Sequence, residues 1–136
     1  MKLGFFGFIP FPFLILLSVT DKNNFDIYIK FTLFYLFLII SFIGASYWGI
    51  AIYLKKKTLA MPFFSVIPSI LVSILYLLNI DLVFKLLLGI VTLNIVFLYE
   101  AMNFKKVLPN WYLFLRGILN LFVTISILVI ILLRKY

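Results

Sequence analysis

Long apolar runs separated by short polar segments dominate this chain and limit what it can fold into. Five such runs occupy residues 3–19, 31–54, 61–78, 82–99 and 111–133. A helix needs about 20 residues, with a range of about 17–25, to cross the hydrocarbon of a bilayer. Backbone groups in lipid must pair within their own segment, so these runs are expected to be helices rather than strands. The pattern predicts an all-α fold, in which residues 1–136 form one polytopic membrane domain, a bundle of five transmembrane helices.

The composition supports a membrane protein and not a soluble one. The chain is 66% hydrophobic and 12% charged, whereas a soluble domain is about 45–50% apolar and about 25% charged. A small domain buries only about two-thirds of its surface on folding, so the excess apolar surface must face lipid. The net charge of +8 comes from basic residues placed between the apolar runs, where they set membrane orientation. Membrane lipids, other membrane-protein subunits or a second copy of the chain are therefore the expected partners, and nucleic acid is not.

The chain contains no cysteine and no histidine. Thiolate or imidazole zinc sites, cysteine-held iron–sulfur clusters and His-ligated haem are thereby excluded. Cysteine and histidine nucleophiles and histidine bases are excluded as well. We therefore predict no metal, no cofactor and no catalytic residues.

The first apolar run is short and resembles a signal peptide. The end of this run, Leu17–Thr20, lacks the small residues of a signal-peptide cleavage site, so we expect the helix to be retained in the mature protein. The compact lysine clusters 55–57 and 105–106 fall on the same side as the N-terminus, and the acidic residues Asp21, Asp26 and Asp81 fall on the other. This asymmetry places the N-terminus on the cytoplasmic or matrix side.

Small residues recur at a spacing of four in the second and third runs. The second run carries Ser41, Ala45 and Gly49, with Gly44 beside this stripe, and the third carries Ser65, Ser69 and Ser73. Residues four apart share a helix face, and small residues let membrane helices approach closely. We expect these two helices to pack through the stripes, and a polar path for a solute is the alternative.

One basic residue lies inside the last apolar run. Arg116 is about 7 Å from the start of that run, at about 1.5 Å per residue. Intramembrane charges usually point inward and pair, and Glu100 is the acidic residue on the same side. An intramembrane Glu100–Arg116 ion pair is therefore predicted, with Asn120 and Thr124 on the same helix face as Arg116. The alternative is that Arg116 extends to the headgroups on its own.

Two further polar residues lie within the fourth run. Lys85 is close to an interface and is expected to extend into it or to pair with Asp81 four residues earlier. Asn94 is expected to make a hydrogen bond between helices.

The unusual residues gather in the half of the membrane nearest the N-terminus. They are the glycines and prolines of the first run, Pro62 and Pro68 of the third, and Trp48 and Trp111. Proline in a helix frees a backbone carbonyl and bends the chain. A ligand or partner site is expected in this half, open to the cytoplasm or the inner leaflet. The residues expected to pack there or to line it are Ser41, Gly44, Ala45, Trp48, Gly49, Ser65, Pro68, Ser69, Trp111 and Asn120.

An ordered set of short motifs resembles the transmembrane protein 69-like family, a five-helix membrane domain of unknown function. The motifs are Leu3–Phe11, Ser41–Gly44 with Trp48-Gly49, Ser65–Pro68, and Trp111–Leu113 with Leu115-Arg116. The resemblance covers the whole chain and implies a bacterial or mitochondrial inner membrane. Tyr47 and Phe114 stand where this family often carries basic side chains, so any role that needs those charges is in doubt here.

Three classes of function follow from these observations. The leading one is a non-enzymatic structural or accessory subunit that binds a protein partner or a lipid in the cytoplasmic-side leaflet. The alternative is a small oligomeric transporter or channel for a small solute or lipid, although no acidic residue lies mid-membrane for proton coupling and no inverted repeat is evident. An enzyme is the weakest reading, because it would depend on Glu100, Arg116, Ser65 or tyrosines alone.

Overall fold

The computed structural model describes residues 6–53 and 60–134, and its regular elements there are all helical. The prediction of an all-α chain is confirmed within these ranges, while the predicted features at residues 2–4, 55–57 and 135 lie outside them. The elements are α2 (Pro10–Thr20), the 3-10 helix η1 (Lys22–Asn24), α3 (Phe25–Tyr53), α4 (Ala60–Leu77), α5 (Leu82–Phe104) and α6 (Asn110–Leu133).

Two helices are longer than the apolar runs that predicted them. α3 begins at Phe25 and not at 31, and α5 continues to Phe104, beyond 99. The first turn of α3 includes Asp26, and a carboxylate is favourable at the positive end of a helix. Polar residues therefore extend these helices beyond the apolar segments.

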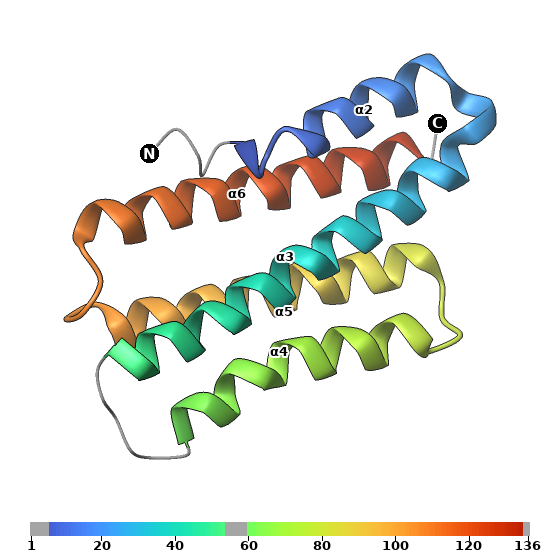
Figure 1. Cartoon of the computed structure of the whole chain (residues 1–136). Helices are drawn as coiled ribbons and strands as arrows, with labels where there is room; N and C mark the ends of the chain where they lie inside the picture. The colour runs from blue at the N-terminus through green and yellow to red at the C-terminus, as the bar shows by residue number, and fades with distance from the viewer. Residues whose placement is uncertain (1–5, 54–59, 135–136) are drawn as a thin grey trace.

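The central helix of the bundle is α3, which packs against α2, α4 and α5, while α6 packs against α2 and α5. Figure 1 shows α2 lying along α6 on one side of α3, and α4 lying on the other side. The end of α3, the start of α4 and the α5–α6 connection lie at one end of the bundle. We call it the lysine end, because Lys105 and Lys106 follow α5 there.

Large apolar side chains point outward from every helix. Examples are Phe13, Phe42, Ile70, Ile95 and Leu121, all at least half exposed. A monomeric soluble protein rarely exposes continuous apolar surface on this scale. The outer surface of the bundle is therefore suited to lipid.

Three helices in the described part of the chain are long and apolar enough to cross a membrane: Lys22–Ile50, Leu82–Phe104 and Asn110–Leu133. Two further apolar helices are shorter, at Pro10–Thr20 and Phe64–Leu77. On length and composition the long helices support a membrane protein, and the predicted bundle of five spans stays a prediction.

The predicted first helix is interrupted at its beginning. A turn at residues 7–9 precedes α2, which has proline at its first positions, Pro10 and Pro12. Proline has no N–H to donate to a carbonyl four residues earlier. The carbonyls of Phe6 and Phe8 instead accept from the N–H groups three residues on, at 3.3 and 3.1 Å. Continuous helix therefore runs for 11 residues only, or about 16 Å.

The closest approach between α3 and α4 is at Gly44. A Cβ there would lie 2.8 Å from the carbonyl oxygen of Ser65 and 3.0 Å from Cγ of Pro68. Ser65 and Pro68 are buried, so the predicted contact between these helices is present at this point.

The rest of the predicted small-residue stripe lies elsewhere. Ala45 and Gly49 are exposed, and a Cβ at Gly49 would meet nothing within 4 Å. Ser41 is half-buried, and Ser73 is exposed and donates to the carbonyl of Ser69 in its own helix at 2.7 Å. The neighbouring face of α3, with Ile40, Gly44 and Tyr47, is buried instead, and Gly44 makes the close contact with α4.

Candidate functional site

A cavity of about 300 Å³ lies between α3 and α6, towards the lysine end of the bundle. Most of its lining is apolar, with Leu93 of α5 at the back and the segment before α2 at one edge. Phe42 lines it and is 79% exposed, so the cavity reaches the outer surface beside α3. The full lining is Gly7, Phe8, Ile39, Phe42, Ile43, Ser46, Leu93, Tyr112, Leu115, Arg116, Leu119, Asn120 and Val123.

The interrupted start of α2 explains why this cavity exists. The helix covers only part of α6 in Figure 1, and the segment ahead of it borders the cavity. Two contacts fix that segment: the hydroxyl of Tyr35 donates to the carbonyl of Gly7 at 2.8 Å, and the ring of Phe8 lies 5.5 Å from that of Phe122. Among the described residues, the turn at 7–9 and not a helix therefore borders this part of the space between α3 and α6.

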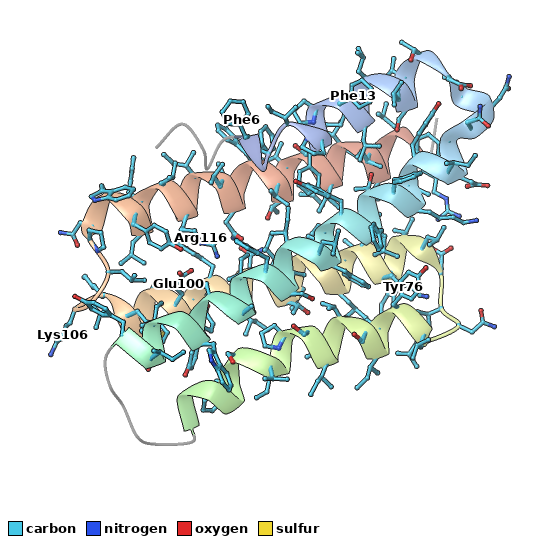
Figure 2. The ribbon with its side chains drawn as sticks, viewed as in Figure 1. Phe6, Phe13, Tyr76, Glu100, Lys106 and Arg116 are labelled. Carbon is cyan, nitrogen blue, oxygen red and sulfur yellow. The ribbon has the colours of Figure 1, made fainter. Side chains whose placement is uncertain are left out.

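Arg116 and Glu100 face each other between α6 and α5, as Figure 2 shows. Nη2 and Nε of Arg116 donate to the same carboxylate oxygen, Oε2, at 3.1 and 3.2 Å. Glu100 is fully buried, whereas the Arg116 side chain is 18% exposed. The second oxygen of Glu100, Oε1, has no hydrogen-bond partner among the described residues. The structure thus brings together the two predicted partners, and Arg116 is the member that also lines the cavity.

A short polar network continues from Arg116 along the α5–α6 interface. Asn120 Nδ2 donates to Oδ1 of Asn94 at 2.8 Å. Asn94 Nδ2 donates to the carbonyl of Ile90 at 2.8 Å and lies 3.4 Å from Oγ1 of Thr124. The hydrogen bond between helices predicted for Asn94 is therefore confirmed, and Asn120 also lines the cavity.

Two tyrosines near the ion pair were missed from the sequence. Tyr47 is buried, donates to the carbonyl of Val96 at 2.9 Å, and stacks on Phe104 at 5.3 Å. Tyr112 lines the cavity one helical turn before Arg116. Its i−4 spacing from Arg116 was the signal that would have identified it.

Several predicted site residues lie away from the cavity. Trp48 and Trp111 are 50% and 54% exposed and do not line it. Gly44, Ser65, Pro68 and their neighbours instead form the α3–α4 contact on the other side of α3, so they are packing residues.

The opposite end of the bundle is closed by a different ion pair from the predicted one. Arg134 Nη1 lies 3.2 Å from Oδ2 of Asp81, while Lys85 donates to the carbonyl of Tyr76 at 2.7 Å. Asp81 also caps α5 by accepting from the N–H of Val83 at 3.0 Å. This backbone bond, followed by the hydrogen bond and charge of Arg134, holds the pKa of Asp81 below its usual value.

A polar hollow of about 500 Å³ lies at the same end, between the end of α2 and the end of α6. It is lined by both signs of charge, from Lys22, Asp26 and Arg134. At its edge Asp21 accepts hydrogen bonds from Asn24 and Tyr28, which lower the pKa of Asp21. These opposed charges favour no particular ligand, so the cavity near Arg116 is the better candidate site.

The cavity has the chemistry of a binding site. Its available donors come from Arg116 and Asn120, while Tyr112 interacts with Glu100 and Ser46 donates to the carbonyl of Ile43 in its own helix at 2.6 Å. In the part of the chain that the structure describes, no three Asp, Glu, His or Cys side chains lie together as a metal site would require. An apolar pocket with a few convergent polar groups is the usual form of a small-molecule site.

Comparison with known proteins gives a family but no activity. No curated protein and no solved structure matches the chain. A family model described as "Protein of unknown function (DUF3429)" matches residues 1–132. That match does not support the narrower transmembrane protein 69-like resemblance, which stays a prediction. The chain belongs to the DUF3429 family, an uncharacterised domain that here occupies essentially the whole sequence.

Proposed function

We propose that this chain is a non-catalytic integral membrane protein that binds an amphiphilic lipid in the cavity between α3 and α6. The observation that carries the proposal is the cavity itself: a mainly apolar space with Arg116 and Asn120 on one wall and an opening at Phe42. A lipid that enters from the bilayer would bury its polar end against α6 and leave its chain in contact with Phe42. An accessory role, in which the bound lipid or a protein partner is presented on this side of the bundle, follows from such a site.

The proposal includes five crossings of an inner membrane with the N-terminus on the cytoplasmic or matrix side. α2 and α4 are short, but both run alongside the long helices in Figure 1. Residues 6–9, which precede α2, continue towards the lysine end and add to its length. The lysines that follow α5, with those between α3 and α4 in the sequence, favour this orientation.

A solute path through the bundle has less support. The polar side chains between α5 and α6 are anchored to one another in pairs, Arg116 to Glu100 and Asn120 to Asn94, and their unused donors face one cavity and not a path through the bundle. Groups paired in this way stabilise helix packing and leave no continuous row of free groups for a moving ion.

The experiment is lipid analysis of the purified protein by native mass spectrometry. The native chain is compared with Leu119→Trp, which would fill the cavity, and with Leu121→Trp, a matched control on the lipid-facing side of the same helix. We expect the native chain and Leu121→Trp to retain bound lipid and Leu119→Trp to lose it. Equal lipid retention in both variants would refute the site.

Protein analysis of the same preparation addresses the accessory role. A stoichiometric protein partner that is lost in Leu119→Trp, with no lipid present, would show that the cavity binds a polypeptide and not a lipid. A partner retained in Leu119→Trp would place the protein contact elsewhere on the bundle, alongside the lipid site.

A further inference from the structure

Arg116 has hydrogen-bonding capacity that Glu100 does not use. A guanidinium carries five N–H donors, and the ion pair employs two of them, both on one oxygen of Glu100. A bidentate Arg–carboxylate pair would use both carboxylate oxygens in two parallel hydrogen bonds. Here Nη1 makes no hydrogen bond within the described residues, and the side chain lines the cavity. The ion pair therefore orients Arg116 while leaving part of its charge available.

Two neutral polar side chains extend this group along α6. Tyr112 is four residues before Arg116 and Asn120 is four residues after it, so all three share one helix face. Asn120 uses an amide N–H to reach Asn94, which leaves its second N–H and its carbonyl oxygen for other partners. The wall of the cavity formed by α6 thus offers a central cation between a phenol and an amide.

The position of this wall suits the head group of a lipid. Arg116 lies within the second turn of α6, near the lysine end of the bundle where Lys105 and Lys106 are exposed. Basic residues beside a membrane attract anionic lipids. The volume of about 300 Å³ is at the lower limit of ligand pockets, so it would hold a head group and the first part of a chain.

Building on the proposed lipid-binding function, we infer that the head group is an oxyanion, a carboxylate or a phosphate, bound by the free N–H groups of Arg116. Asn120 contributes a hydrogen bond on one side, Tyr112 borders the head group on the other with its hydroxyl directed at Glu100, and the acyl chain leaves the cavity past Phe42. Arg is the side chain best matched to such planar or forked oxygen groups.

Glu100 is a positioning residue in this arrangement. It is fully buried behind Arg116 and does not line the cavity. Its carboxylate holds the guanidinium in place, but its negative charge opposes a second anion nearby. Removing the charge while keeping the carbonyl acceptor should therefore strengthen the binding of an acid, an effect that a purely structural residue would not produce.

The test measures binding of three sixteen-carbon probes to the full chain in detergent: palmitic acid, palmitoyl lysophosphatidic acid and palmityl alcohol. The native chain should bind at least one acid about tenfold or more tightly than the alcohol, the effect of a charged hydrogen bond. E100Q should bind that acid more tightly than the native chain does. The double variant R116Q/E100Q keeps a neutral hydrogen-bonding pair and should lose the preference for acids, and Leu121→Trp should behave as the native chain.

The outcomes separate this inference from the proposed function. If the native chain binds the alcohol as tightly as both acids, the head-group assignment is overturned and the lipid site stands. If no probe binds, both are overturned. An acid preference that persists in R116Q/E100Q would overturn the role of Arg116, and the absence of any gain in E100Q would overturn the role of Glu100.

Discussion

Substituting Gly44 by alanine tests the packing of α3 against α4. The new Cβ would lie 2.8 Å from the carbonyl oxygen of Ser65 and 3.0–3.1 Å from the ring of Pro68. Ordinary contact begins at about 3.4 Å, and neither neighbour can rotate away, because one is backbone and the other is a ring fixed to it. The variant must therefore push the two helices apart or lose the contact.

The size of the effect is worked out against Gly49→Ala in the same helix. Both substitutions replace glycine within α3, so the gain in intrinsic helix propensity, about 0.5–1 kcal/mol, largely cancels between them. A Cβ at Gly49 would meet nothing within 4 Å. The difference between the variants is then the overpacking term, about 1–3 kcal/mol, or about a 5- to 150-fold change in the unfolding equilibrium.

The assay is unfolding in mixed micelles with increasing sodium dodecyl sulfate, followed by circular dichroism. Gly49→Ala should unfold at the same detergent fraction as the native chain or slightly higher, and Gly44→Ala at a clearly lower one. If the two variants unfold together, the close approach at Gly44 is not a rigid contact and the reasoning fails.

Four other substitutions test the polar contacts. Arg116→Leu should cost about 3–5 kcal/mol, because it leaves a buried carboxylate without its partner. Glu100→Gln should cost about 1–2 kcal/mol, because it keeps a weaker acceptor; an unchanged Glu100→Gln in thermal unfolding would show that the two do not act as a pair. The lowered pKa of Asp81 means that its carboxylate stabilises the fold fully above its ordinary value of 3.8 and progressively less as pH falls through the folded-state pKa. Asp81→Asn should remove that part of the acid-unfolding curve, and identical curves would contradict it. Tyr47→Phe should cost about 0.5–1.5 kcal/mol in the same detergent titration, by loss of its bond to a backbone carbonyl; no loss would mean that a water or lipid replaces the hydroxyl.

Some contacts were predictable because the membrane leaves few choices. Arg116 lies within an apolar run, and Glu100 was the acidic residue on its side of the sequence. Intramembrane charge and amide groups are costly when left unpaired, so their partners can be sought among few candidates. The same argument applied to Asn94, which meets Asn120 on the neighbouring helix.

The faces of the helices were not predictable in the same way. Lipid is as apolar as a protein core, so hydrophobicity does not distinguish the inward face of α3 from the outward one. Ala45 and Gly44 are neighbours in sequence, and their side chains differ by about 100° around the helix. The sequence prediction placed the α3–α4 contact on the stripe that contains Ala45 and Gly49. In the structure the contact lies at Gly44, one residue before Ala45. Small residues allow helices to approach closely, but they do not determine which of them lies in the interface.

The cavity follows from an interruption in one helix and not from any motif at the site. Pro10 and Pro12 end regular hydrogen bonding upstream of α2, so this helix covers only part of α6. Arg116 lies on the part of α6 that α2 does not cover, where its side chain reaches both the buried Glu100 and the space beside α3. The interruption ahead of α2 and the half-used guanidinium thus meet at one place, because Gly7 and Phe8 border the cavity into which Arg116 projects.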